Sequence, residues 1–542
     1  MREAPALRQL TAHFFRGLFD FGVLTEMGAD SLRHMLLGGA GALVAVGFFL
    51  TRIYAGKYAA LRAAITAEPY RRALLGDDLF IIGAPMLLSA FVTLLVSHSL
   101  FPDERDFRIL GPLPVRRPVV FAAKLTALGM FGGAVVAVTH LALAPLVILT
   151  SFSRWSEHAA PMRLVVWLVA GPAACGFAML AMATTAGVLR GIAKSALLAG
   201  LVMCVPLVLQ LPALGTALSA GPSWLILLPP AWFVGLERWL LGTSDPWFGR
   251  LAALALTVTA SVTIAMVLIY VRLFRSFERL MLRPVAGASG RGRSDRLVGS
   301  SRAAPARRAI QAFTTATLRR SPLHQGALAG VAACGMGLAV SRLASAPASE
   351  FAAAAVWTPF AVMFMCAVGL RVSLALPHEQ RANWIFKTTE DEAMRRDLRL
   401  AVDRVAAAVI VGPPVVAGAA LLWIPFGAGA VIAVAVVALI GFVLAQIVLQ
   451  DWRRVPFTAS YVPGKRFIVQ SVVVGFVRWL VFTLAGTLLV RGAVSGISRA
   501  LVIAALLGAA IWLRRRRRIA TSIAMPLTFE DELPDQVFRL QL

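Results

Sequence analysis

The stretch of sequence that decides the fold is Ala401–Gln450, which reads AVDRVAAAVIVGPPVVAGAALLWIPFGAGAVIAVAVVALIGFVLAQIVLQ. It holds two apolar runs, 401–424 and 427–450, and the residues between them, 425–426, include no Lys or Arg. A helix rises about 1.5 Å per residue, so about 20 residues cross a hydrocarbon layer about 30 Å thick. Each run is therefore predicted to be a membrane-spanning helix.

The composition of the whole chain is that of a membrane protein. Of its 542 residues, 59% are hydrophobic and 15% are charged, whereas a soluble domain has about 25% charged residues. The apolar runs are continuous, which excludes the alternating pattern of a β-barrel. The net charge of +26 comes from basic loops between apolar runs, a pattern that indicates contact with lipid headgroups and not with nucleic acid. We predict an all-α polytopic integral membrane protein.

Similar runs recur along the chain and predict about twelve transmembrane helices in two six-helix halves. The predicted spans are 34–54, 78–100, 119–150, 162–189, 195–219, 249–274, 325–346, 353–376, 401–424, 427–450, 467–490 and 497–513. A basic segment with the sequence GASGRGRS at Gly287–Ser294 separates the halves. The predicted domains are an N-terminal segment 1–33, a first half 34–274, a linker 275–324, a second half 325–513 and a tail 514–542.

The distribution of basic residues predicts the orientation. The linker and the run Arg514–Arg518 are rich in arginine, so both termini are expected in the cytoplasm of a bacterial cell, with the chain in the plasma (inner) membrane. The segment 55–77 is an exception, because it carries four basic residues and would lie outside. Either it breaks the rule, or a span or re-entrant segment near the N-terminus, His13–Leu24, is missing from the count.

The segment Gly221–Leu241 has the length of a span but contains helix-breaking Pro229-Pro230 and the charged pair Glu237-Arg238. Trp224, Trp232 and Trp239 lie in it, and Trp247 follows. Trp prefers the membrane interface, so we expect a broken helix at the outer surface or dipping into it.

The sequence contains no motif for catalysis or for nucleotide binding. It lacks a P-loop, an HExxH motif and a Gly-x-Ser-x-Gly motif, so we predict no enzymatic activity, no cofactor and no metal site. The four cysteines, Cys175, Cys204, Cys334 and Cys366, all fall in apolar runs without metal-ligand spacing and are interpreted as small core residues.

Arg478, Gln446 and His140 are candidate functional residues among the polar residues inside predicted spans. Arg478 falls near the middle of 467–490, where a charge costs about 2.5–3.5 kcal/mol, so it is expected to face the bundle interior or an aqueous cavity. Gln446 and Gln450 on the preceding span are possible partners. His140 has no evident acidic partner and is interpreted as a packed, hydrogen-bonded residue.

Three short segments carry a resemblance to a known family. LFPDERDFRILGPLPV at Leu100–Val115, followed by Ala123-Lys124-Leu125, resembles the cytoplasmic loop after the second span of bacterial ABC-2-type transporter permeases. LPHEQRANWIF at Leu376–Phe386 occupies the same place in the second half. That segment and VPFTASYVPGK at Val455–Lys465 resemble bacterial permease-like proteins.

The resemblance covers about a third of the chain and implies a separate ATP-binding-cassette ATPase subunit as partner. Such a subunit would push on rigid charged loops at the cytoplasmic face, to which Glu390, Asp391 and Glu392 would also contribute. The residues expected to form the ATPase-coupling loops are Asp103, Glu104, Asp106, Arg108, Leu113, Pro114, Arg116, Arg117, Pro377, Glu379, Arg381 and Trp384.

One departure from the family pattern and two alternatives to the ABC-type function remain at this stage. Gly221–Leu241 resembles the re-entrant element before the last span of ABC-2 exporters, but the second half has only a short loop near Arg491. A secondary transporter driven by an ion gradient would also have six plus six spans, although membrane-embedded acids for proton coupling are scarce. A non-transporting membrane scaffold or a membrane-bound enzyme is the third alternative.

Overall fold

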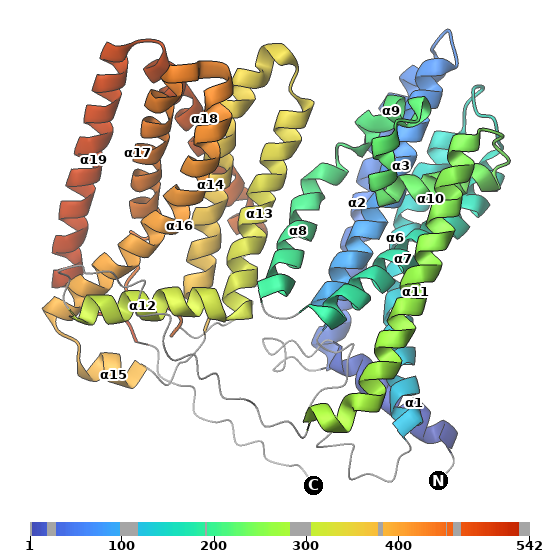
Figure 1. Ribbon diagram of the computed structural model, residues 1–542, viewed down its shortest axis with the longest axis horizontal. Coiled ribbons are helices and arrows are strands. Elements are labelled where there is room, and N and C mark those ends of the chain that lie inside the picture. The colour runs from blue at the N-terminus through green and yellow to red at the C-terminus, as the bar shows by residue number, and fades with distance from the viewer. Residues whose placement is uncertain are drawn as a thin grey trace. The chain divides into compact units, whose positions relative to one another are not determined.

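The computed structural model describes residues 3–18, 29–97, 117–189, 192–281, 305–377, 383–450, 452–458 and 468–529 (Figure 1). Every regular element in these ranges is a helix, which confirms the all-α fold. The chain divides into two compact units: unit 1 comprises 1–190 and 208–287, and unit 2 comprises 191–207 and 288–542. The first part of the fifth predicted span thus groups with unit 2.

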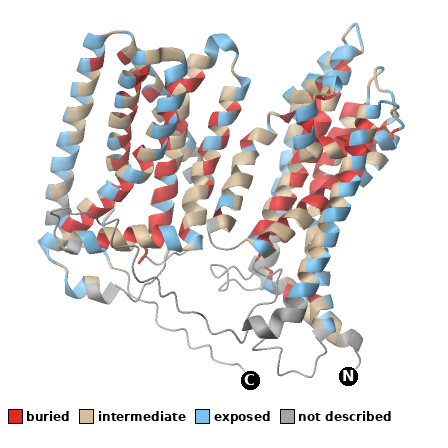
Figure 2. Ribbon diagram, viewed as in Figure 1, coloured by how far each residue is buried: buried red, intermediate tan, exposed pale blue. Residues whose placement is uncertain are grey.

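Unit 1 consists of long helices joined at one end by several short ones. Its elements are α1 (Glu3–Gly17), α2 (Ala29–Arg62), α3 (Glu68–Leu95), α6 (Arg117–Ser151), α7 (Ala160–Val188), η1 (Leu211–Leu214), α9 (Gly215–Ala220), η2 (Ser223–Leu227), α10 (Pro229–Leu240) and α11 (Pro246–Met281). The most buried residues lie on α3, α7 and α10, which pack on one another (Figure 2). As the sequence predicts, the double proline ends the preceding segment, and α10 begins at Pro229.

Unit 2 is built around α14, whose buried face carries Phe360, Met363, Ala367 and Leu370 (Figure 2). Its elements are α8 (Ile192–Val208, without its last residue), α12 (Pro305–Arg320), α13 (Pro322–Ser345), η3 (Ala348–Glu350), α14 (Phe351–Ala375), α15 (Asn383–Thr388), α16 (Glu392–Phe426), η5 (Gly427–Gly429), α17 (Ala430–Val448), α18 (Ile468–Val494) and α19 (Ile497–Ala524). Helices α13, α16 and α18 pack directly on α14.

The described helices match the predicted spans in length. Ten are long and apolar enough to cross a membrane, or up to eleven if the bent pair 193–208 and 211–220 forms one span. The longest candidate, Glu392–Val448, consists of two helices, α16 and α17, which pack against each other. Each of the twelve predicted spans therefore has a helix or a bent helix pair as its counterpart, and the chain is a multi-pass membrane protein.

The structure describes part of the N-terminal region that the predicted orientation left open. Residues 13–17 belong to α1, which has 15 residues and is too short to span a bilayer, and residues 19–24 lie outside the described residues, so both alternatives for this region stay open. The segment 55–77 is mostly helical, because α2 ends at Arg62 and α3 begins at Glu68. Its basic side chains have partners inside unit 1: Lys57 pairs with Asp77 at 2.7 Å, and Arg71 pairs with Glu157 at 2.9 Å.

Candidate functional site

Most of the predicted coupling residues lie outside the described residues. This applies to Asp103, Glu104, Asp106, Arg108, Leu113, Pro114, Arg116, Glu379 and Arg381. Arg117 begins α6 and Trp384 lies in α15, but the structure does not describe their side chains. Their role in coupling stays a prediction.

The structure brings two of the three resemblance segments together at the end of α14. The backbone amide of Phe457 donates to the carbonyl of Leu374, next to Leu376-Pro377, at 3.1 Å. The Phe457 side chain is fully buried against the ring of His324, with ring centroids 4.8 Å apart, and its φ of 67° is rare for a non-glycine residue. His324 in turn lies 3.2 Å from the Leu376 carbonyl through Nε2. This junction is therefore tightly packed.

Two acids that were expected on a docking surface have structural partners within unit 2, and their role in docking stays a prediction. Asp391 caps α16 by accepting a hydrogen bond from the Met394 amide at 2.6 Å. Glu390 accepts one from the Leu527 amide at 2.7 Å, which holds the segment after α19 against the start of α16. Both carboxylates thus contribute to the fold of unit 2.

Arg478 was expected to face the bundle interior or an aqueous cavity. It lies well inside α18, which runs from Ile468 to Val494, and its side chain is exposed, so it does not belong to the packed core of unit 2. Its contact with an aqueous cavity stays a prediction. Gln446 is half-buried, and its Oε1 has no hydrogen-bond partner among the described residues.

His140 is a packed core residue, as the sequence predicts. It is 4% exposed, its Nδ1 lies 2.8 Å from the Val136 carbonyl, and its ring lies against Trp167 with centroids 4.7 Å apart. A Cβ on Gly171 would lie 2.4 Å from His140 Nε2, so the glycine is needed for this close approach. Among the described residues no acid contacts the ring.

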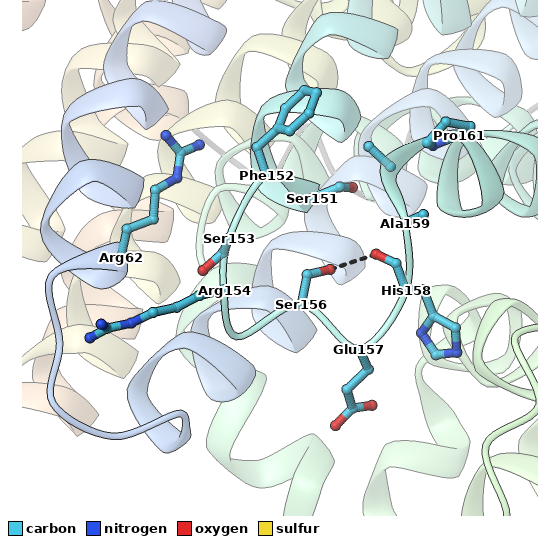
Figure 3. A pocket seen from close by; sticks show the side chains of 11 residues that line it. Arg62, Ser151, Phe152, Ser153, Arg154, Ser156, Glu157, His158, Ala159 and Pro161 are labelled. Carbon is cyan, nitrogen blue, oxygen red and sulfur yellow. Dashed lines mark hydrogen bonds between the residues drawn. The ribbon is translucent and has the colours of Figure 1, made fainter.

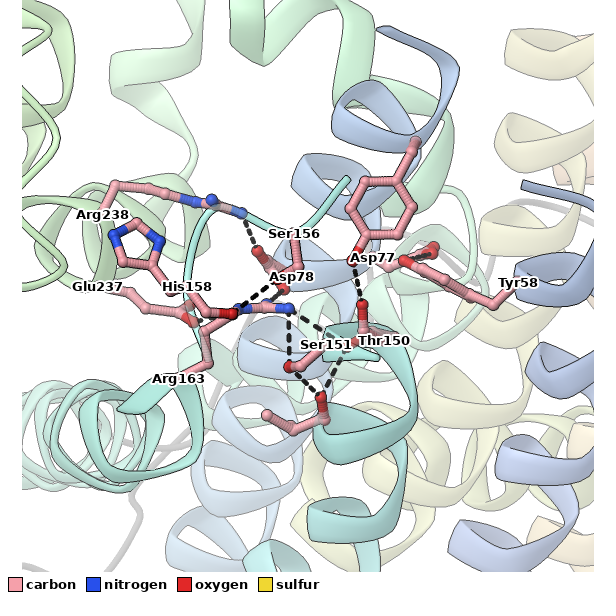
Figure 4. Close-up of polar contacts among 12 residues, drawn as sticks. Tyr58, Asp77, Asp78, Thr150, Ser151, Ser156, His158, Arg163, Glu237 and Arg238 are labelled. Carbon is pink, nitrogen blue, oxygen red and sulfur yellow. Dashed lines mark hydrogen bonds and ion pairs between the residues drawn. The ribbon is translucent and has the colours of Figure 1, made fainter. Parts of the chain in front are cut away.

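The most unusual feature of unit 1 is a buried charge cluster centred on Asp78 of α3 (Figure 4). Arg163 of α7 donates to Asp78 Oδ1 at 2.8 Å, and Arg238 of α10 donates to Asp78 Oδ2. Arg163 also donates to the Ser151 hydroxyl of α6 at 3.1 Å. The side chains of Asp78, Arg163 and Arg238 are 3%, 2% and 10% exposed, so the ion pairs are shielded from solvent.

Glu237 is the fourth charged member of the buried charge cluster and is held less tightly than Asp78. It is 1% exposed, and its Oε1 lies 3.9 Å from Arg163 Nη2, which is an ion-pair distance but too long for a hydrogen bond. Its Oε2 has no hydrogen-bond partner among the described residues. Helix α10 is not among the membrane-spanning candidates. Burial, and next the charge of Asp78, raise the pKa of Glu237 to about 7, while the two arginines oppose this shift.

A second group of polar residues adjoins the buried charge cluster through the neighbouring residue of α3, Asp77. Lys57 donates to both carboxylate oxygens of Asp77 at 2.7 Å, and the buried Tyr58 hydroxyl donates to Oδ2 at 2.8 Å. Lys57 is 39% exposed, so this side of the site reaches the surface. The two adjacent acids of α3 therefore bind cations from different helices.

An open hollow of about 740 Å³ reaches Ser151, which accepts a hydrogen bond from Arg163 of the buried charge cluster (Figure 3 shows the residues that line the hollow). The turn between α6 and α7 forms most of its wall, and Arg62, Arg154, Glu157 and His158 contribute its charged or titratable side chains. Ser151 lines the hollow and also accepts from Arg163, so it separates the hollow from the buried ions.

Sequence reasoning did not identify this cluster. Glu237-Arg238 was noted only as a break in an apolar segment, and Asp77, Asp78 and Arg163 lie at the edges of predicted spans. The available signal was the presence of several charges of both signs near span ends within one half. Comparisons with protein-family models, with curated proteins and with solved structures return no match for this chain.

Proposed function

We propose that the chain is the membrane-spanning permease subunit of an ABC-type transporter, energised by a separate ATP-binding subunit. The observation that carries the proposal is an arrangement that occurs in both units. In each, an amphipathic helix packs on the beginning of the third long membrane helix of the unit: α1 on α6, and α12 on α16. The segment that resembles an ABC-2 permease loop, Leu100–Val115, precedes α6, and the segment in the corresponding place of the second half, Leu376–Phe386, precedes α16.

In unit 1 the contact uses the Ala-Lys-Leu motif of the resemblance. Phe14 of α1 packs against the fully buried Ala123, and Lys124 Nζ lies 5.4 Å from the centre of the Phe14 ring. The small side chain of Ala123 allows α1 to approach α6 closely. Leu10 and Leu7 extend the same apolar face of α1, about one and about two helical turns before Phe14.

In unit 2 the corresponding contact combines apolar packing with an ion pair. Ile310 of α12 and Leu398 of α16 belong to one buried cluster. Arg307 of α12 donates to Asp397 Oδ1 from both Nε, at 3.0 Å, and Nη2, at 2.6 Å. The Asp397 side chain is only 6% exposed, so solvent weakens this ion pair little, and the pair fixes α12 to α16.

This repeated arrangement supports a mechanical role. A separate ATPase can move membrane helices only if it acts on a rigid part of the permease. A surface helix that is fixed to the start of a long membrane helix is such a rigid part, and the neighbouring loop provides charges for recognition. Two such helices in one chain would serve the two subunits of an ATPase dimer. Both termini would lie in the cytoplasm and the chain in the bacterial inner membrane.

Reversing the acids of the first loop is expected to separate the permease from its ATPase. Asp103, Glu104 and Asp106 replaced together by Lys should weaken co-purification with the ATP-binding subunit, because like charges opposed across an interface cost several kcal/mol. Thermal stability should change by less than about 0.5 kcal/mol, as for other loop substitutions. The measurement is ATP hydrolysis and subunit stoichiometry after purification from native membranes.

The matched control is Asp245→Lys, which reverses an exposed acid before α11. It should leave the complex intact, and the chain without its partner should hydrolyse no ATP. The proposal fails if the wild-type chain purifies without an ATP-binding subunit, or if the triple variant keeps full ATPase activity and stoichiometry.

Labelling with a membrane-impermeant maleimide on intact cells tests the proposed orientation. In a background without native cysteines, Ser294→Cys and Met525→Cys should remain unlabelled, because the basic segments beside them favour the cytoplasm. Glu157→Cys, in the turn at the opposite end of α6 from α1, should label. The reverse pattern would contradict the orientation.

One observation favours a secondary transporter as the second candidate. Asp77, Asp78 and Glu237 place three buried carboxylates in unit 1, and such acids are where a coupling ion can bind. The two candidates differ in energy source: ATP depletion should stop an ABC-type transporter, whereas a protonophore should stop a proton-driven one.

A further inference from the structure

The buried charge cluster contains one carboxylate that its arginines do not satisfy. Asp78 accepts hydrogen bonds from both Arg163 and Arg238, one on each oxygen. Glu237 receives no hydrogen bond from either arginine, although it is equally buried and lies next to Arg238 in sequence. A buried carboxylate oxygen without a donor is costly when ionised, and a proton on that oxygen removes most of the cost.

Each helix that packs on α10 contributes residues to the surroundings of Glu237. Helix α3 presents Asp78, α7 presents Arg163, and α10 itself presents Arg238. Helix α11 meets α10 through Leu251 and the backbone of Phe248 and Ala252, which approach Gly235. The immediate environment thus holds two cations and one competing anion, with apolar packing behind.

The open hollow brings solvent close to the buried charge cluster. The hollow reaches Ser151, and the Ser151 hydroxyl is one hydrogen bond from Arg163. In this chain of contacts the Ser151 side chain and the Arg163 guanidinium lie between the hollow and Glu237 (Figure 4).

Helix α10 is a short element with a break at each end. Pro229-Pro230 begins it, and Gly242, with φ of 86°, follows its last residues. Its contacts with α3 and α7 include the pair of Arg238 with Asp78 and the Phe233 ring, whose centroid lies 5.6 Å from that of Phe177 in α7. A change in the charge of Glu237 therefore acts directly on the side chains that hold α10 in place.

We propose that Glu237 is a reversible proton-binding site, which holds a proton while the cluster has the geometry described here and releases it to solvent when the pH rises. On release, the Glu237 carboxylate becomes an acceptor that competes with Asp78 for Arg163 and Arg238. This loosens the attachment of α10 to α3. The proton is the ligand, and α10 is the element that responds. The inference holds whichever energy source drives the chain.

The direction of the pH effect follows from the raised pKa of Glu237. The folded protein holds this proton up to about pH 7, whereas the unfolded chain loses it near the ordinary value of 4.5. The stabilisation is therefore fully present below pH 4.5 and is lost as pH rises to about 7. Above that range Glu237 contributes no further change.

The test compares the purified full-length chain with Glu237→Gln, which mimics the protonated side chain. Between about pH 5 and about pH 8, the wild-type melting temperature should fall by several degrees, and that of Glu237→Gln should fall much less. Infrared difference spectra over the same range should show loss of a protonated-carboxyl band in the wild type but not in the variant. The control Glu157→Gln, which removes an exposed carboxylate, should behave like the wild type in both measurements.

Three results would overturn the proposal. The first is the same pH profile for the wild type and Glu237→Gln. The second is an infrared band that persists in Glu237→Gln, because another group would then hold the proton. The third is a Glu237→Gln protein that fails to fold at low pH, since an isosteric neutral residue would be tolerated if the native side chain were protonated there.

Discussion

Replacing Asp78 by Asn is expected to lower the stability of the protein by about 3–5 kcal/mol, which is the typical cost of removing one partner from a buried ion pair. Asp78 neutralises two guanidinium groups at once, and the side chains of both arginines are at most 10% exposed. After the substitution, Arg163 and Arg238 face an amide that accepts more weakly, and Glu237 is the remaining acid among the described residues around them. The measurement is the temperature at which half of the detergent-solubilised protein leaves the monodisperse peak in size-exclusion chromatography.

Two controls separate a charge effect from a general loss of folding. Glu157→Gln breaks the exposed pair with Arg71 and should cost less than about 1 kcal/mol. The double variant Asp78→Asn with Arg238→Gln should cost less than the sum of the single variants, because the second change removes a charge that the first left unpaired. Strict additivity, or an Asp78→Asn protein as stable as the wild type, would show that the buried charge cluster does not act as a unit.

Two glycines of α2 are expected to respond to the same substitution with opposite signs. Gly47 is buried in a helix whose face is otherwise largely exposed, and a Cβ there would lie 2.1 Å from the carbonyl oxygen of Ala142 in α6. Because the obstacle is backbone, no side-chain rotation relieves it, and α2 must move away from α6. Gly47→Ala should therefore cost about 3 kcal/mol, the upper end of the usual range for overpacking.

Gly56→Ala is the matched control, since a Cβ at Gly56 meets nothing within 4 Å. Alanine is the better helix former by up to about 1 kcal/mol, so this variant should be as stable as the wild type or more so. The measurement is the thermal unfolding temperature of both variants and of the wild type in the same detergent. Equal effects at the two positions would show that α2 and α6 are not in close contact at Gly47.

The local features of this chain could be predicted from its sequence. Apolar runs of about 20 residues become long helices because a helix satisfies every backbone group within the membrane. The break at Pro229-Pro230 is equally local, because proline lacks the amide that a helix interior requires. The amphipathic helix α12 was predictable in the same way, since Ile310, Thr314 and Leu318 recur at helical spacing on its buried face. It was missed because its basic residues indicated a linker.

Arg478 shows what a local rule leaves open. The cost of inserting a charge was applied at the centre of a span taken as 467–490. Helix α18 covers Ile468–Val494, close to that span, yet the Arg478 side chain is exposed and lies outside the packed core. The position of a charge along a span does not determine which side of the helix carries it, because that depends on the rotation of the helix and on its neighbours.

Length, hydropathy and proline positions by themselves determined that this protein is a bundle of membrane-spanning helices with one broken segment, because these properties depend only on adjacent residues. The tertiary structure alone decided which charges meet. Asp78 binds Arg163, 85 positions away, and Arg238, 160 positions away. Such pairings depend on how each helix is rotated about its axis and on which helices are neighbours, and neither is encoded in any single stretch of sequence.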